Sequence, residues 1–440
     1  MTPRKPQTPP GIHDLLPKDH EFHTFIKKVV RHRARQAGFL RITTPILEFA
    51  EIVENSLGAE SALAKKMYTF EDPQGVRLAL KPEGLTGIMR AYLQHNMDTW
   101  TKPVELYFIE PHFRYETPQK GLYRQFWQFG FEVIGEHDPA LDAQCISLAY
   151  KIFKDLGVEK RLQLRLNNIG GPKTREKMKD VLLNYYIGKE RSLCGNCNTL
   201  LQSSPLELLA CQEEDCQILA QLAPKMKDYR TKEDQDFYRA TKSFLDELGI
   251  EYTEDESLVR GPEYYTQTVF EFWPKNGGRA EALCRGGRTD GLIEKMGGTP
   301  TPALGFTCGM DRLVMHMKEA GMTVPSKDKV HVFVAQLGED AKRKALPLID
   351  ALRERGVHTV GALGKGSMKD QLALATTFGV PHMLLLGITE VREGTVIIRD
   401  MAKGQQRHLK MEDAVDEVVK LIGEAQLDTY SPGEVSLGSS

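Results

Sequence analysis

Two stretches of this 440-residue chain place arginines beside aromatic and strand-forming residues, a combination suited to an anionic substrate. In residues 258–272 (LVRGPEYYTQTVFEF), Arg260 and the pair Tyr264 and Tyr265 precede a run that alternates like a strand. A guanidinium is costly to bury unless it meets an anion, so Arg260 is predicted to bind a phosphate or a carboxylate. The alternative is a surface turn before an ordinary strand.

Residues 113–135 (FRYETPQKGLYRQFWQFGFEVIG) are the second stretch, and a loop signature interrupts their period-two alternation. The pattern predicts a hairpin that carries arginines, an amide and carboxylates on one surface. The residues of that surface are Arg114, Glu116, Arg124, Phe126, Gln128 and Glu132. A solvated antiparallel face alternates in the same way. However, Trp127, Phe129 and Phe131 predict that both faces are covered, and covered polar groups need partners such as a ligand.

With these residues the chain resembles the class II aminoacyl-tRNA synthetases, and among them the histidyl-tRNA synthetase family. Residues 113–135 are similar to motif 2 of the class, and residues 258–272 to the first histidine-specific signature. Four further segments agree in order and spacing: 38–48 (GFLRITTPILE) with motif 1, 80–84 (LKPEG) with the strand that reaches the amino-acid pocket, 286–292 (GGRTDGL) with the second histidine signature, and 304–313 (LGFTCGMDRL) with motif 3.

The resemblance implies an α+β catalytic domain of the class II synthetase type, with an antiparallel sheet, in residues 1–171 and 230–324. Residues 172–229 are predicted to form a helical insertion domain. Residues 329–424 are predicted to form a C-terminal α/β anticodon-binding domain, in which strands and helices alternate around a mostly parallel sheet. Residues 425–440 are predicted to be a disordered tail.

The resemblance also implies the reaction, which is ATP-dependent ligation of histidine to its tRNA through a histidyl-adenylate. Bringing an anionic carboxylate to an anionic phosphate needs positive charge, and Arg114 and Arg260 match the catalytic arginines of the family. Arg312 would hold the outer phosphates, with Mg²⁺ bridging them. The ATP-binding residues implied by the family are Arg114, Glu116, Arg124, Phe126 and Arg312.

Histidine would be held at both of its ends. Glu83, Gln128 and Glu132 match positions that accept hydrogen bonds from the α-ammonium group, and Tyr264 and Tyr265 are candidates to bind the imidazole. Four positions depart from the family pattern: Lys81 replaces an arginine, Leu85 a threonine, Leu122 a donor in the motif 2 loop, and Thr289 a tyrosine at the imidazole. These departures keep an alternative open, a non-charging paralogue that serves as a histidine-sensing regulatory subunit or an RNA-binding pseudo-enzyme.

The predicted insertion contains two close pairs of cysteines. Cys194 and Cys197 form a C-x-x-C pair, and Cys211 and Cys216 form a C-x₄-C pair a short loop later. Four thiols so spaced in a reducing compartment fit a structural zinc site. The alternative is four free cysteines in a small helical domain.

Composition limits the cellular setting. The 58 basic and 60 acidic residues give a formal charge of −2, so contact with tRNA must come from local patches. We find no run long and apolar enough to span a membrane, and no signal-peptide core in residues 1–10. With an odd count of seven cysteines, these features predict a cytoplasmic enzyme. Motif 1 implies a homodimer.

Overall fold

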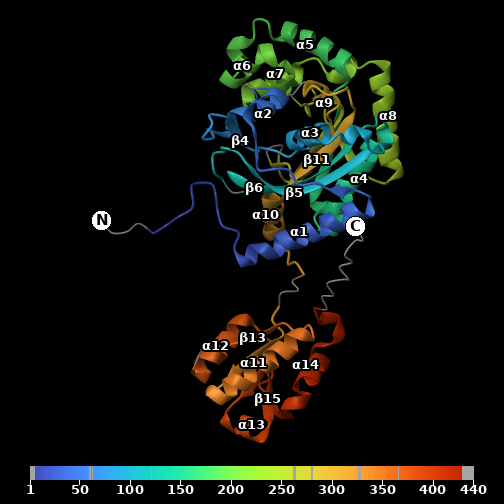
Figure 1. The fold of residues 1–440 in the computed structure, drawn as a ribbon. Helices are drawn as coiled ribbons and strands as arrows, with labels where there is room; N and C mark the ends of the chain where they lie inside the picture. The colour runs from blue at the N-terminus through green and yellow to red at the C-terminus, as the bar shows by residue number, and fades with distance from the viewer. Residues whose placement is uncertain are drawn as a thin grey trace. The chain divides into compact units, whose positions relative to one another are not determined.

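The computed structural model describes residues 5–58, 61, 63–119, 121–260, 264–278, 281–325, 329–364 and 366–428. The chain divides into two compact units, Met1–Val324 and Pro325–Ser440 (Figure 1). Each unit has its own hydrophobic core, so each is described by itself.

An eight-stranded sheet organises the first unit. In spatial order its strands are β1 (Leu40–Arg41), β5 (Val104–Phe113), β6 (Gln125–Ile134), β11 (Ala303–Gly309), β10 (Cys284–Arg288), β9 (Thr266–Pro274), β7 (Leu162–Asn168) and β8 (Tyr252–Glu254). The six strands from β5 to β7 pair antiparallel with one another, whereas β1 pairs in parallel with β5 and β8 in parallel with β7 at the two edges. The predicted antiparallel catalytic sheet is confirmed.

Alternation along β5 and β6 decides what each face of this sheet contacts. Tyr107, Ile109, Phe129 and Phe131 point into the largest core. That core is completed by α1 (Pro17–Gln36), α4 (Pro139–Asp155), α8 (Lys232–Glu247) and α10 (Met310–Glu319). In Figure 1, α1 and α10 lie below β5 and β6. The opposite face carries Phe126, Gln128, Gly130 and Glu132, so the polar residues of the hairpin are free to line a site.

Short elements cover part of that second face. They are α2 (Ala50–Leu57), α3 (Leu85–Gln94), α9 (Leu292–Lys295) and a three-stranded sheet in the order β2 (Leu47–Phe49), β4 (Arg77–Leu80) and β3 (Tyr68–Glu71). Helices α3 and α9 pack on Leu106 and Phe108 of β5 in a separate apolar cluster. Figure 1 shows α2 and α3 above the strands.

The segment predicted as an insertion folds into α5 (Pro172–Tyr186), α6 (Gly195–Ser203) and α7 (Glu214–Leu222), with 3₁₀ turns between them. Its core also contains Leu258, Val259 and Val269 from the histidine signature. These helices gather at the top of the first unit in Figure 1. The insertion therefore packs directly against the strand that carries the predicted site.

The second unit contains a five-stranded sheet in the order β13 (Thr359–Gly361), β12 (Val332–Gln336), β14 (His382–Leu386), β15 (Thr395–Asp400) and β16 (Gln406–Lys410). Its helices are α11 (Glu339–Glu354), α12 (Met368–Phe378), α13 (Ile388–Glu393) and α14 (Ala414–Ile422). The α/β class is confirmed. The prediction of a mostly parallel sheet is wrong, because β14, β15 and β16 pair antiparallel, and their connections are only the short helix α13 and a turn, too short for a parallel crossover.

The predicted disordered tail begins too early. Glu424–Gln426 forms a 3₁₀ turn, Leu427 packs on the core of the second unit, and the amide of Asp428 donates to the carbonyl of Gly356 at 2.9 Å. Residues 429–440 lie outside the described residues. Within the described part of the chain, the longest helices are too polar to cross a lipid bilayer, and none qualifies as a membrane span.

Candidate functional site

A cavity of about 560 Å³ opens on the polar face of the large sheet. Seven of the residues predicted to act on histidine or ATP line it: Glu83, Arg114, Glu116, Glu132, Arg260, Tyr264 and Tyr265. They come from the end of β4, the motif 2 hairpin and the approach to β9. The fold therefore brings Arg114 and Arg260 to one space although they are far apart in the chain.

A second cavity of about 340 Å³ adjoins the first. Phe126, Gln128 and Arg312 line it, and Arg114 and Glu116 line both cavities. Gln128, which was predicted to bind the α-ammonium group of histidine, thus lies on the side predicted for ATP. Its position follows from β6, where Gln128 comes four residues before Glu132 and its side chain lies on the same face.

The floor between the catalytic side chains is built from small residues. Across the sheet, Glu132 of β6 is paired with Gly305 of β11, and Gly305 with Gly287 of β10. An added Cβ on Gly305 would lie 2.0 Å from Oε2 of Glu132. Glycine is needed there so that the carboxylate can lie flat across the neighbouring strand.

Arg114 is held in place by its neighbours in the hairpin. The sequence predicted that Arg114 and Glu116 lie on a strand, but β5 ends at Phe113 and both residues lie in the following loop. Nε of Arg114 donates to the carbonyl of Pro82 at 2.7 Å, and its guanidinium lies 4.9 Å from the ring centroid of Phe126. Burial lowers the pKa of Arg114 to about 10, which leaves it charged near neutrality.

Arg260 is anchored by a buried carboxylate. Its Nη1 donates to Oε1 of Glu271 at 2.7 Å, while Oε2 of Glu271 accepts from Nε1 of Trp273 at 2.6 Å. Burial opposes the charge of Arg260, but Glu271 and the adjacent tyrosines raise its pKa overall. Nη2 of Arg260 is buried without a hydrogen-bond partner in the described part of the chain. That donor is available to a ligand in the cavity.

The residues predicted for histidine form the other end of the first cavity. Oε2 of Glu132 is buried without a hydrogen-bond partner among the described residues, and burial followed by the charge of Glu83 raises the pKa of Glu132 well above its ordinary value. Glu83 accepts from the amides of Leu85 and Thr86 at 2.5 and 2.9 Å, which fixes its carboxylate at the start of α3. The rings of Tyr264 and Tyr265 lie 4.9 Å apart at the same end.

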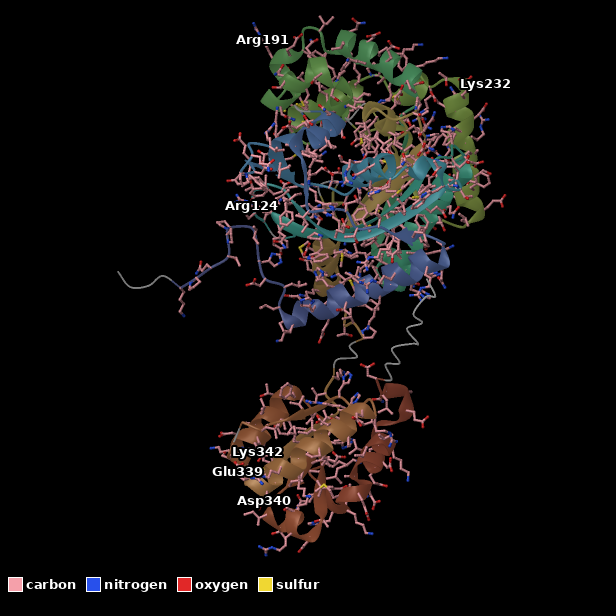
Figure 2. The ribbon with its side chains drawn as sticks, in the orientation of Figure 1. Arg124, Arg191, Lys232, Glu339, Asp340 and Lys342 are labelled. Carbon is pink, nitrogen blue, oxygen red and sulfur yellow. The ribbon has the colours of Figure 1, made fainter. Side chains whose placement is uncertain are left out.

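The remaining predicted ATP residues differ in their placement. Glu116 accepts from Nζ of Lys66 at 2.7 Å, and Nε of Arg312 donates to the carbonyl of Gly121 at 3.3 Å. Arg124 lines neither cavity, because it stacks over Tyr115 at 3.9 Å and donates to the carbonyl of Glu116 at 3.0 Å. Figure 2 labels Arg124 at the edge of the first unit. Its role in binding ATP stays a prediction.

Sequence reasoning missed Lys66, Glu271 and Arg285. Lys66 and Arg285 line both cavities, and Glu271 lines the first. Glu271 could have been found from its alternation with Phe270 and Phe272, since a carboxylate on a covered strand needs a cation. The position of Lys66 depends on the fold of a loop, and no local pattern points to it.

The four departures from the family pattern fall into two groups. Lys81 is buried and forms an ion pair with Glu110. Its Nζ also donates to the carbonyl of Thr44 at 3.0 Å, so Lys81 has a structural role beside the site. Leu85, Leu122 and Thr289 line the cavities themselves. The hydroxyl of Thr289 is buried and has no hydrogen-bond partner within the described residues.

The four cysteines predicted to bind zinc are brought together. The sulfur atoms of Cys194, Cys197, Cys211 and Cys216 all lie within 4.8 Å of one another. The amide of Cys194 donates to Sγ of Cys216 at 3.2 Å, and the amide of Cys197 donates to Sγ of Cys194 at 3.4 Å. Backbone amides aimed at sulfur stabilise thiolates, the form that binds metal. Cys197 and Cys211 also line the first cavity.

An antiparallel sheet with an arginine hairpin on one face, joined to a separate α/β unit, defines a class II aminoacyl-tRNA synthetase. Comparisons with known proteins agree. The family model described as "Histidyl-tRNA synthetase" matches residues 11–313, and that described as "Anticodon binding domain" matches residues 331–421. The chain belongs to the histidyl-tRNA synthetase family.

Individual relatives match over nearly the whole chain. A histidine–tRNA ligase of Dehalococcoides mccartyi is 39% identical over 94% of this chain and 100% of its own length. One of Aquifex aeolicus is 38% identical, covering 92% and 98%. Among solved structures, the apo histidyl-tRNA synthetase of S. aureus superimposes with a TM-score of 0.80 at 28% identity, covering 94% of this chain and 99% of that one.

Proposed function

We propose that this chain ligates histidine to its tRNA in two steps, through a histidyl-adenylate formed in the two adjoining cavities. The observation that carries the assignment of the site is that Arg114 and Arg260 line one cavity together with Glu132 and Tyr264. Positive charge from two directions is what a carboxylate needs in order to attack an α-phosphate.

Histidine lies in the first cavity in this proposal. The carboxylates of Glu83 and Glu132 accept from its α-ammonium group, and Tyr264 and Tyr265 contact its imidazole. The unpartnered oxygen of Glu132 and the hydroxyl of Thr289 provide further polar contacts. The carboxylate of the bound histidine then faces Arg114 and Arg260. A site that hydrogen-bonds a polar side chain can reject apolar analogues by about 10⁴–10⁵.

ATP lies in the second cavity and extends into the first. Phe126 and the stacked guanidinium of Arg114 form an aromatic and cationic wall for the base and the α-phosphate. Arg312 on α10 faces the same cavity and binds the outer phosphates. The family uses a divalent cation with ATP, which neutralises phosphate charge when it is bound. Gln128 is assigned to this cavity rather than to the α-ammonium group.

The cysteine cluster is proposed to hold one structural zinc ion. Four thiols within 4.8 Å of one another, with two amides donating to sulfur, satisfy the ligand count and chemistry that Zn²⁺ requires. Bound zinc would tie Cys194 and Cys197 at the start of α6 to Cys216 of α7. Metal analysis of gently purified protein is expected to give about one zinc per chain. Protein without zinc whose four thiols titrate freely would end this proposal.

A homodimer is proposed from the surface of motif 1. Leu40, Ile46, Leu47 and Phe49 are each 44–60% exposed along β1, β2 and their connection. Apolar residues clustered in this way mark an interface. The molecular mass in solution tests the proposal, and Phe49→Asp is expected to shift the mass toward that of a monomer. The clustered thiols and the need for ATP and tRNA favour the cytoplasm as the compartment.

The non-charging alternative has less support. The family's regulatory subunits lack an anticodon domain and an equivalent of Arg260, whereas this chain matches that domain at residues 331–421 and places Arg260 in the cavity. Histidine-dependent exchange between pyrophosphate and ATP distinguishes the two functions. We expect exchange with histidine and none with other amino acids.

Arg260→Ala tests the assigned chemistry in the same assay. Removing a charge that acts in the transition state is expected to lower the exchange rate by about 10²–10³. Arg239→Ala, on the exposed side of α8, is the matched control and is expected to exchange at the wild-type rate. An Arg260→Ala rate equal to that of wild type would show that the reaction does not use this arginine.

A further inference from the structure

Arg285 is a cation of the site to which the proposed function gives no role. It lies on β10, and its side chain is 43% exposed, although it lines both the 560 Å³ cavity and the 340 Å³ cavity. Arg114, Glu116, Lys66 and Thr307 are the other residues shared by the two cavities. Arg285 is therefore at the junction between the histidine end and the ATP end.

The register of the sheet places Arg285 between the two substrates. On β6, Glu132 at the histidine end is followed on the same face by Gly130, Gln128 and then Phe126 at the base end. Gly130 pairs with Thr307 on β11, and Thr307 with Arg285 on β10. One step of two residues along a strand spans about 7 Å. The row that contains Arg285 is thus one step from Glu132 and two steps from Phe126. A phosphate chain that joins the base end to the histidine end must pass this row.

The charges around Arg285 favour an anion. Its Nε lies 3.4 Å from Oε1 of Glu271, the oxygen that already accepts from Arg260 at 2.7 Å. One carboxylate facing two guanidiniums leaves the group of three with a net positive charge. The protein surroundings of Arg285 lower its pKa, Glu271 acts against this shift, and the charges of Arg260 and Arg312 lower the pKa further. Arg260 lines the first cavity and Arg312 the second, so Arg285 has a further cation on either side. An anion between them relieves that repulsion.

We propose that Arg285 binds the phosphate chain of ATP and is a further substrate-binding residue of the activation step. The inference rests on the proposed function, which supplies ATP as the anion in this cavity. Arg285 acts from the floor of the sheet, whereas Arg114 comes from the hairpin loop and Arg312 from α10. The phosphates are then held from three elements.

The test compares Arg285→Ala and Arg285→Gln with Arg165→Ala. Arg165 of β7 is paired with the other side of Glu271 and carries the same charge, but it lines neither cavity. Calorimetry gives the Kd of ATP and of histidine separately, and pyrophosphate exchange gives the KM values. Loss of one charge-assisted contact is expected to raise the Kd and KM of ATP by about ten- to hundredfold. The Kd of histidine should change less than twofold, and Arg165→Ala should match wild type.

Several results would overturn the inference. One is an unchanged Kd of ATP in both Arg285 variants. Another is weaker binding of histidine with unchanged binding of ATP, because Arg285 would then only hold Glu271 and Arg260. A loss confined to transfer to tRNA would assign Arg285 to a tRNA phosphate instead. If Arg285→Ala fails to fold, Arg285→Gln, which keeps most of the side-chain volume, gives the result. Wild-type protein that binds ATP but shows no histidine-dependent exchange would instead count against the proposed function.

Discussion

Oε2 of Glu132 lies directly over Gly305 of the neighbouring strand. A Cβ atom added to Gly305 would be only 2.0 Å from this oxygen. The carboxylate crosses the floor of the first cavity because the adjacent strand offers no side chain there. Gly287 of the second histidine signature is paired with Gly305 and continues the same floor. The spacing between Glu132 and β11 therefore depends on the missing side chain of Gly305.

Gly305→Ala tests this spacing. The added methyl group must displace the carboxylate of Glu132, and overpacking of this kind costs about 1–3 kcal/mol. The Kd of histidine, measured by calorimetry without ATP, is expected to rise by about tenfold or more. Gly309→Ala on the same strand is the control, because a Cβ there meets no atom within 4 Å. Equal affinities for histidine in the two variants would show that Glu132 does not need the space left by the missing side chain of Gly305.

Glu132→Gln is expected to stabilise the protein while it impairs the site. Burial and then Glu83 raise the folded pKa of Glu132 well above the ordinary 4.5, so the folded state holds its proton to a higher pH than the unfolded state does. The contribution of Glu132 to the free energy of unfolding is therefore fully present below its ordinary pKa, and it is lost as the pH rises through the raised folded pKa. Glutamine cannot ionise, so the variant escapes that loss.

The measurement is the free energy of unfolding of both proteins between pH 4 and pH 8. The advantage of Glu132→Gln is expected to be absent near pH 4 and to grow with pH, while histidine binds more weakly because its α-ammonium group keeps only the carboxylate of Glu83. Glu247→Gln, on an exposed position of α8, should follow wild type throughout. Parallel curves for Glu132→Gln and wild type would contradict the raised pKa.

Much of the site could be predicted from the local pattern of the sequence. Alternation in the hairpin placed Phe126, Gln128 and Glu132 on one face, and it did so correctly because the side-chain period of a strand is fixed. The alternation of strands and helices predicted for residues 329–424 is present in the second unit, as in helix Met368–Phe378 and strand His382–Leu386. Patterns of this kind depend only on neighbours in sequence.

Features set by tertiary contacts could not be read in the same way. Arg285 reaches the site through its pairing with Glu271 and Thr307, which only the register of three strands determines. Arg124 alternates correctly in sequence, yet its guanidinium turns to the ring of Tyr115 and the carbonyl of Glu116. Edge strand β16 is polar and mostly exposed, so it lacks the apolar alternation that marks a strand.

Removal of zinc is expected to weaken histidine binding as well as stability. Cys197 and Cys211 line the first cavity, and the core of the insertion includes Val259 and Val269 beside Arg260. Cys211→Ser, or treatment with a strong chelator, should release the metal and lower Tm by about 2–4 °C for each kcal/mol lost. The Kd of histidine should rise in parallel. Cys145→Ala, a core thiol outside the cluster, is expected to keep its zinc and its affinity for histidine. Metal-free protein with unchanged Tm and Kd would show that the cysteine cluster affects neither stability nor histidine binding.

Thr289→Val removes a hydroxyl group that has no hydrogen-bond partner within the described part of the chain but lines the histidine cavity. Because the isosteric valine deletes a buried, unsatisfied group, the free energy of unfolding of the ligand-free protein should stay the same or increase. If the hydroxyl binds the imidazole, the loss of one neutral hydrogen bond raises the KM of histidine by about two- to twelvefold, with kcat little changed. Thr268→Val alters a buried threonine on the opposite face of β9 and should leave this KM unchanged. A KM for Thr289→Val equal to that of wild type would mean that Tyr264 and Tyr265 bind the imidazole without this hydroxyl group.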